Sequence, residues 1–286
     1  MSPPLTTLLE GLRFPEAPRW HQGRLWFSDF FRQEVIAFNA QGEMEVQFKL
    51  ADSPSGLGWR PDGTLLVVSM HDQRLLAWRG AGSALEIVAD LSAHAGGPCN
   101  DMVVDAHGRA YVGNFGFDLY AREEARSTAL LRVDPDGSVH RVASDLWFPN
   151  GMVITPDGRT LIVAETFRNR LSAFRIAPDG GLSERRVFAE LPGVYPDGIC
   201  LDAEGAVWLA DARGNAVLRV VEGQSEVARL STGSHQSYAC ALGGEDGRTL
   251  FVCTAPGVGP KAGALHEGRI ECTQVQVPSA AALSSP

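Results

Sequence analysis

Six copies of one short pattern recur along the chain, and this repeat limits the possible folds more than any other feature. Each copy is a turn containing glycine followed by a short run of strand-forming residues, and successive copies begin 40 to 50 residues apart. This spacing is typical of a four-stranded propeller blade. The copies are GRLWFSD at 23–29, GTLLVVS at 63–69, GRAYVGN at 108–114, GRTLIVA at 158–164, GAVWLAD at 205–211 and GRTLFVC at 247–253.

The segments around each copy complete a blade. Asp-Gly and related turns between apolar runs indicate hairpins, because glycine accepts the positive φ that such turns need. The segments expected to be the innermost strands are short and apolar, at 17–20, 56–59, 102–105, 152–155, 199–202 and 239–242. Amphipathic segments follow the hairpins, and no segment keeps a helical period. The sequence therefore predicts an all-β fold, a six-bladed β-propeller with four-stranded antiparallel blades.

The two ends of the propeller are also predicted. Segments 6–9 and 270–277 are expected to pair in the last blade and to close the ring, which removes free sheet edges. We expect a single propeller over residues 1–278 and a loose C-terminal tail over 279–286, which is small and polar.

Composition narrows the range of possible partners and functions. With 25 Lys and Arg against 34 Asp and Glu the net charge is −9, which argues against a nucleic-acid partner. No signal peptide and no apolar stretch of membrane-spanning length is evident, so we expect a cytoplasmic protein with no membrane partner. The five cysteines form no CxxC pair and are interpreted as free thiols. The expected partner is a small-molecule substrate, and the expected assembly is a monomer or a small homo-oligomer.

One polar series stands in front of the predicted innermost strands. Because blades are related by rotation, equivalent positions ring one end of the central channel. Of the four acidic and amide members of the series, three directly follow proline, whose fixed φ would hold their side chains in place. An alternative is that Pro-Asn-Gly and Pro-Asp-Gly occur here only because they form good turns. This alternative could explain any single such residue, but it explains less well why all four acidic and amide residues stand at equivalent positions. The series is Glu16, Ser55, Asn100, Asn150, Asp197 and Tyr238.

This ring predicts a metal site. Two carboxylates and two carboxamides supply hard oxygen donors, and the ring contains neither His nor Cys. Two negative charges would balance a dication. We expect one divalent ion at the centre of the propeller, with Ca²⁺ favoured and Mg²⁺, Mn²⁺ and Zn²⁺ as alternatives.

In this order on six blades, FPEAP, CND, FPNG and YPDG resemble the senescence-marker-protein/gluconolactonase/luciferin-regenerating-enzyme family over nearly the whole chain. The resemblance implies a six-bladed propeller with one divalent metal and, in many members, hydrolysis of lactones. It implies that Glu16, Asn150 and Asp197 bind the metal and that Asn100 contacts the substrate or the metal. It also implies that Asp197 acts as the general base.

The chemistry of the ring fits these roles. A metal could polarise a lactone carbonyl, and a carboxylate beside it could accept a proton from the attacking water. We therefore expect a metal-dependent carboxylic-ester hydrolase, a gluconolactonase-like lactonase. Two alternatives stay open: an organophosphate or aryl-ester hydrolase that uses the same site, and a non-catalytic ligand-binding propeller with a structural Ca²⁺.

Aromatic residues near the ring favour an apolar or aromatic lactone over a sugar lactone. At the position where sugar lactonases of this family often carry a basic residue, the chain has Pro98. Segment 118–128 is expected to form a loop over the channel mouth. An alternative is that the aromatic side chains only pack between blades. Besides Asn100, the predicted substrate contacts are Phe14, Phe115, Phe117, Trp147, Tyr195 and Tyr238.

Overall fold

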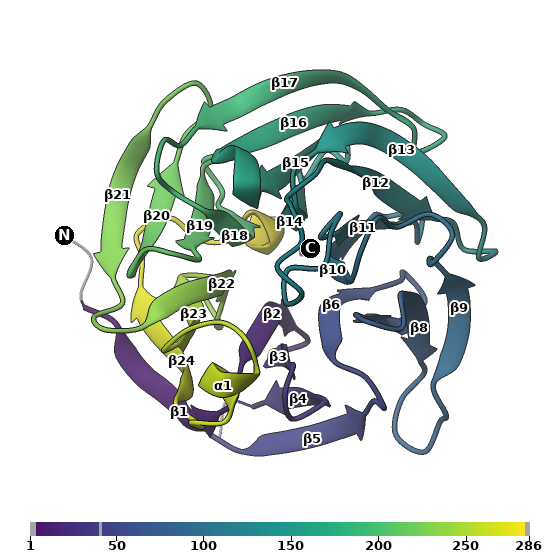
Figure 1. The fold of residues 1–286 in the computed structure, drawn as a ribbon. Helices are drawn as coiled ribbons and strands as arrows, with labels where there is room; N and C mark the ends of the chain where they lie inside the picture. The colour runs from purple at the N-terminus through teal and green to yellow at the C-terminus, as the bar shows by residue number, and fades with distance from the viewer. Residues whose placement is uncertain (1–3, 40–41, 284–286) are drawn as a thin grey trace.

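The computed structural model describes residues 4–39 and 42–283, and within them the chain forms six four-stranded antiparallel sheets arranged around a central axis (Figure 1). The strands nearest the axis are β2 (Pro15–His21), β6 (Pro54–Trp59), β10 (Cys99–Val104), β14 (Pro149–Ile154), β18 (Pro196–Leu201) and β22 (Gln236–Gly243). These strands begin two or three residues earlier than predicted. The predicted six-bladed propeller is confirmed.

The second strand of every blade is the run that follows the repeated glycine. These strands are β3 (Arg24–Asp29), β7 (Leu65–Ser69), β11 (Ala110–Asn114), β15 (Thr160–Glu165), β19 (Val207–Asp211) and β23 (Thr249–Ala255). The glycine of each hairpin turn has a positive φ, between +70° and +85°, which explains why glycine recurs there. These six glycines are Gly23, Gly63, Gly108, Gly158, Gly205 and Gly247.

Two further strands complete each blade. The third strands are β4 (Glu34–Phe38), β8 (Arg74–Trp78), β12 (Thr128–Val133), β16 (Arg170–Ile176), β20 (Ala216–Val220) and β24 (Gly268–Gln274). The outermost strands are β5 (Met44–Lys49), β9 (Glu86–Asp90), β13 (Val139–Leu146), β17 (Leu182–Glu190), β21 (Glu226–Ser231) and β1 (Thr6–Leu12). Strand β1 pairs with β24, so the last blade contains the first and the last strand of the chain, and the predicted closure of the ring is confirmed.

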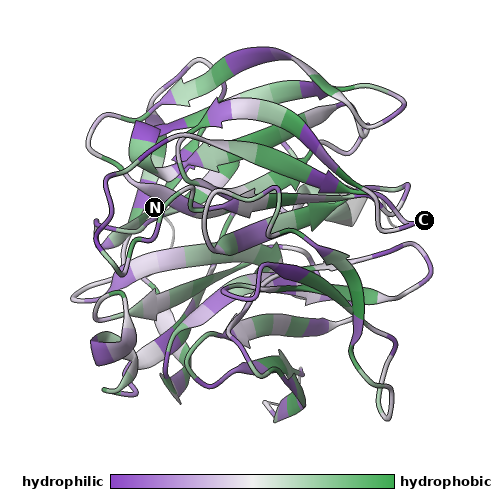
Figure 2. Cartoon of the chain, turned by 45° about the vertical axis from the view of Figure 1, so that its right-hand side comes forward, coloured by the Kyte–Doolittle hydropathy of each residue, from purple (hydrophilic) through white to green (hydrophobic). Residues whose placement is uncertain are grey.

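The core lies between neighbouring blades. Apolar side chains of the inner strands pack against those of the next blade, as Leu66 and Val68 do against Met102 and Val112. Figure 2 shows hydrophobic stretches along the strands of the blades. The outermost strands are largely exposed, while the second strands are buried on both faces.

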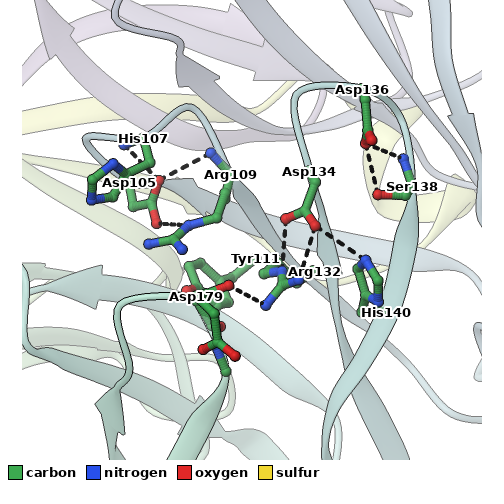
Figure 3. A network of polar contacts seen from close by, with 12 residues as sticks. Asp105, His107, Arg109, Tyr111, Arg132, Asp134, Asp136, Ser138, His140 and Asp179 are labelled. Carbon is green, nitrogen blue, oxygen red and sulfur yellow. Dashed lines mark hydrogen bonds and ion pairs between the residues drawn. The ribbon is translucent and has the colours of Figure 1, made fainter.

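A polar contact also joins two blades (Figure 3). The side chains of Arg109, Tyr111 and Arg132 on the third blade donate hydrogen bonds to backbone carbonyls of the turn 178–180 on the fourth, at 2.8–3.0 Å. Asp105 binds the Arg109 guanidinium at 2.6 Å and so holds it toward that turn.

The C-terminal segment lies at the end of the channel away from the ring residues. Ser279 forms an isolated bridge with Asp202, and the short 3₁₀ turn η2 (Ala280–Leu283) follows. Ala280 is buried. Residues 284–286 lie outside the described residues, so the loose tail stays a prediction there. In the described part of the chain no helix is long and apolar enough to cross a membrane.

Candidate metal centre and substrate cavity

Each predicted ring residue lies near the start of an innermost strand, at the same end of the channel. All six are buried, with 8% or less of their surface exposed. The pairing register of every innermost strand shifts at or next to this residue, which is the mark of a β-bulge. A bulge bends a strand and re-aims its side chains, so a feature repeated six times directs the ring residues toward the channel.

Hydrogen bonds orient the side chains of the ring. Oε2 of Glu16 accepts a bond from the N–H of Ala17 at 2.8 Å. The amide nitrogen of Asn150 donates to Oγ1 of Thr166 at 3.3 Å, which turns the amide oxygen away from that contact. Thr166 in turn donates to the carbonyl of Pro196 at 2.8 Å, next to Asp197.

The charges beneath the ring do not balance. Asp101, the residue after Asn100, is buried and paired with Arg19 at 2.6 Å. With Glu16 and Asp197 this makes three carboxylates against one guanidinium, an excess of two negative charges. Burial, followed by the charge of Asp197, raises the pKa of Glu16 well above its usual value. Burial, followed by the charge of Asp101, likewise raises the pKa of Asp197.

A divalent cation fits this donor set. A buried pair of carboxylates needs a positive partner, and the excess of two charges matches one dication. Within residues 4–39 and 42–283 no three His, Cys, Asp or Glu side chains gather in the arrangement of a metal site, so carboxamides would have to complete the ligands. Asn150 and Asn100 are the carboxamides of the ring.

Three acidic residues that the sequence interpretation missed position the ring. Each ends the second strand of its blade, and each accepts a hydrogen bond from the backbone just before the neighbouring proline-led strand. A polar residue at the end of an apolar strand was the signal that could have revealed them. Asp29 bonds the N–H of Phe14 at 3.1 Å, Glu165 that of Trp147 at 3.0 Å, and Asp211 that of Tyr195 at 3.0 Å.

A cavity of about 890 Å³ opens above the ring, within the range of small-molecule sites. Glu16, Asn100, Asn150 and Asp197 line it together with Thr166. Its walls are largely aromatic. The aromatic side chains that line it are Phe14, Phe30, Phe115, Tyr120, Phe148, Phe167, Tyr195 and Tyr238.

The structure places five of the seven predicted substrate contacts in this cavity, namely Phe14, Asn100, Phe115, Tyr195 and Tyr238. Phe117 and Trp147 are not among the lining residues. Phe117 is buried behind the wall, where its ring packs against Phe148 and Phe167. The ring of Trp147 lies under the guanidinium of Arg168, 4.8 Å from it.

The fourth-blade wall residue is Phe148, one position after Trp147. Phe14, Phe148 and Tyr195 each stand directly before a proline that precedes a ring residue. The aromatic-Pro-ligand pattern was therefore visible in the sequence, and choosing Trp147 misread its register by one residue.

Two loops border the open end of the cavity. The first, residues 115–127, contributes Leu119, Tyr120 and Arg122, in agreement with the predicted loop over 118–128. The second, residues 256–267, contains the short helix α1 (Pro260–Gly263) and was not predicted. The loops approach each other, since a Cβ on Gly259 would lie 3.6 Å from the ring of Tyr120.

Tyr120 reaches toward the carboxylates of the ring. Burial, followed by the charge of Glu16, raises the pKa of this phenol to about 12. It therefore stays protonated near neutral pH and can donate a hydrogen bond. Tyr238, whose hydroxyl donates to Gln236 at 2.6 Å, also has a raised pKa because of burial and the charge of Asp197.

Comparison with known proteins identifies one family. The family description SMP-30/Gluconolactonase/LRE-like region matches residues 14–256. A pentonolactonase from Haloferax volcanii is 32% identical over 165 residues. That alignment covers 56% of this chain and 54% of the relative, so it spans about half the length of the relative.

Two solved structures share the fold. A luciferin-regenerating enzyme superposes with a TM-score of 0.82 and 18% identity, over 95% of each chain. A regucalcin from Agrobacterium tumefaciens, described as a calcium-binding protein, superposes with a TM-score of 0.80 and 24% identity over 96% of each chain. At these sequence identities the superpositions show a shared fold alone.

Proposed function

This chain belongs to the SMP-30/gluconolactonase/LRE-like family, and from that premise we propose that it is a metal-dependent hydrolase that opens an apolar or aromatic lactone. The observation that carries the proposal is the floor of the cavity. Two buried carboxylates, Glu16 and Asp197, lie there with an excess of negative charge and with aromatic walls above them.

Glu16, Asn150 and Asp197 would hold the metal, with Asn100 beside them. Ca²⁺ is the first ion to test, because the donors are hard oxygens and a structural neighbour is described as a calcium-binding protein. When bound, a divalent cation supplies Lewis-acid polarisation of the lactone carbonyl.

The residues of the chain supply the proton transfer. Hydrolysis forms a bond between the water oxygen and the acyl carbon, and it breaks the bond between that carbon and the ring oxygen. Asp197 takes the proton that the water gives up and returns it to the departing ring oxygen. The phenol of Tyr120 can donate a hydrogen bond within the cavity because it stays protonated.

The walls select the substrate. Rings such as Phe14, Phe148 and Tyr195 offer faces for stacking and exclude water from the lactone. A polyhydroxylated lactone would lose hydrogen bonds to water against these rings, which costs binding free energy. The relative from Haloferax volcanii is named for a pentonolactone, so a change of substrate within the same chemistry is part of this proposal.

A hydrolysis screen tests the proposal. The purified protein is treated with chelator, dialysed, and assayed with Ca²⁺, Mg²⁺, Mn²⁺ or Zn²⁺ restored. The substrates are a benzo-fused δ-lactone, an alkyl δ-lactone, glucono-δ-lactone, an aryl ester and a phosphotriester. We expect the benzo-fused lactone to give the highest kcat/KM, and we expect activity to vanish on chelation and to return with metal.

Other results would point elsewhere. Preference for the phosphotriester or aryl ester would favour the alternative use of the same site. Turnover that survives exhaustive chelation would contradict metal dependence, and turnover of none of the compounds would favour a binding propeller.

A further inference from the structure

Three basic side chains line the open end of the cavity, opposite the acidic floor. They come from three separate loops: Arg122 from 115–127, Arg213 from the turn after β19, and Lys261 from α1. Each is exposed. No acidic residue other than Glu16 and Asp197 lines the cavity within the described part of the chain.

Among the described residues these three cations have no acidic partner. The ion pairs found in residues 4–39 and 42–283 involve none of them. Two of the three acids of the Arg122 loop make contacts elsewhere, since Glu123 pairs with Arg126 at 3.2 Å and Asp118 accepts the N–H of Tyr120 at 2.9 Å. Positive charge at the rim is therefore available to a ligand.

Arg213 is held in place by the wall of the cavity. Its guanidinium lies over the ring of Tyr195 at 4.3 Å and near that of Phe167 at 6.0 Å. Stacking of this kind orients the planar group and leaves its N–H edge free. A guanidinium edge suits a planar or tetrahedral oxyanion because two N–H groups can donate in parallel.

We propose that the substrate carries an anionic substituent, a carboxylate, sulfonate or phosphate, on the end remote from its lactone ring. Arg213, Arg122 and Lys261 bind that substituent at the rim while the lactone lies over Glu16 and Asp197. The basic rim gives the cavity a direction, because it attracts the anionic end of the substrate, whereas a bound dication would neutralise the two carboxylates of the floor. The inference rests on the proposed function, because it takes the substrate to be a lactone. The residues that would bind the anionic substituent are separate from those proposed for the hydrolysis.

Matched substrates measure the effect of the charge. A benzo-fused δ-lactone and the same lactone with a carboxylate on its benzo ring are assayed with the wild type and with Arg122→Gln, Arg213→Gln, Lys261→Gln and the triple variant. The readout is the ratio of KM for the charged lactone to KM for the neutral one. We expect this ratio to rise about threefold for each substitution and about thirtyfold for the triple variant, since exposed charge pairs are individually weak.

Arg168→Gln is the matched control. Arg168 also stacks on an aromatic ring, that of Trp147 at 4.8 Å, but it does not line the cavity. The KM ratio should stay at the wild-type value in this variant. Raising the ionic strength should raise the KM of the charged lactone in the wild type and should have little effect in the triple variant.

A binding measurement separates this inference from the proposed hydrolysis. The lactams that correspond to the two lactones, with N–H in place of the ring oxygen, are titrated calorimetrically. Suppose that neither lactone is turned over, but that the wild type binds the carboxylated lactam more tightly than the neutral one and the triple variant does not. The proposed hydrolysis is then wrong and the rim assignment holds. If the carboxylate improves neither KM nor lactam binding, or if Arg168→Gln acts like Arg213→Gln, the rim assignment is overturned.

Discussion

At the scale of single residues, the site is defined by which charges are compensated. Asp101 is buried beside Arg19, which binds it at 2.6 Å, whereas Glu16 accepts a hydrogen bond from a backbone N–H and Asp197 accepts hydrogen bonds from a backbone N–H and an amide. A buried carboxylate without a cation is costly, because water no longer solvates it. Such a pair persists in a fold when something outside the chain supplies the missing charge.

The first prediction concerns Asp197→Asn, which keeps the shape of the side chain and one oxygen donor. If Asp197 takes the proton from water, lactonase activity falls about 10²- to 10⁴-fold even at saturating metal. If Asp197 only binds metal, excess metal restores most of the activity. The measurement is kcat across a metal titration, with metal affinity determined in parallel by calorimetry.

Glu45→Gln is a control for this experiment, since Glu45 is an exposed acid paired with Arg24 far from the cavity. It should leave kcat and metal affinity unchanged. Wild-type activity of Asp197→Asn without added metal would contradict both roles of Asp197.

At the scale of elements, the sequence was most informative where a physical constraint repeats. The glycine turns predicted all six hairpins because each turn needs positive φ, as at Gly63 and Gly205. The ring residues were predicted because rotation converts equal positions in sequence into neighbours in space. The bulges were not predicted, since these short strands are buried on both faces over most of their length and their sequence shows no alternation that a one-residue shift would interrupt.

A loop over 118–128 was predicted, but the loop 256–267 and the side chains that both loops place at the cavity were not. Residues 115–127 and 256–267 do not repeat, so nothing in the sequence places Arg122 and Lys261 at one rim. Segments without a period could be described as loops but not oriented.

The second prediction tests the close approach of two inner strands. A Cβ on Gly151 of β14 would lie 2.5 Å from the backbone N of Ile199 and 2.6 Å from the carbonyl O of Asp197 in β18. Gly151→Ala should therefore push these strands apart, lower the free energy of unfolding by about 1–3 kcal/mol, and weaken metal binding. Urea denaturation and calorimetric metal titration measure the two effects.

Gly257→Ala is the matched control. The added Cβ there would meet no atom closer than the Cβ of Ala262 at 3.7 Å, an ordinary contact. A Gly151→Ala variant as stable as Gly257→Ala would show that the blades can separate without cost.

The third prediction concerns the pH dependence of stability at Glu165. This carboxylate is fully buried and binds Arg170 at 2.9 Å and Arg185 at 2.7 Å. Burial alone would raise its pKa, but hydrogen bonds from Ser172 and Arg185 hold the pKa below the usual 4.5. Because the pKa is lower in the folded state, the stabilisation is complete above pH 4.5 and is lost as the pH falls through the folded-state pKa.

Glu165→Gln should therefore cost about 1–3 kcal/mol at pH 7, and the difference from the wild type should shrink as the pH is lowered toward 3. Chemical denaturation at several pH values measures this difference. Glu222→Gln, which removes an exposed pair with Arg186, should change stability by less than about 0.5 kcal/mol at any of these pH values. If the wild type exceeds Glu165→Gln in free energy of unfolding by a margin that grows as the pH falls, the lowered pKa of Glu165 is contradicted.

At the scale of the whole molecule, the ring of blades is closed twice. Strand β1 closes it at the outer edge by pairing with β24, and its Leu12 is fully buried. The second closure is at the axis, where the proposed metal ligands Glu16, Asn150 and Asp197 come from the first, fourth and fifth blades. An ion bound there would link the first blade to the fourth and fifth, neither of which is its neighbour in the ring.

The last prediction follows from that linkage. Ca²⁺ at about 100 times its Kd should stabilise the wild type by about 2.7 kcal/mol, which corresponds to a rise in Tm of roughly 5 to 10 °C. Glu16→Gln should lose most of this rise, because it removes one of the two uncompensated charges. In chelator the same variant should melt above the wild type, because the repulsion between Glu16 and Asp197 is gone. Glu45→Gln should behave as the wild type in both conditions. Calorimetric melting with and without Ca²⁺ checks these signs, and a Glu16→Gln variant that keeps the full Ca²⁺ shift would remove Glu16 from the metal site.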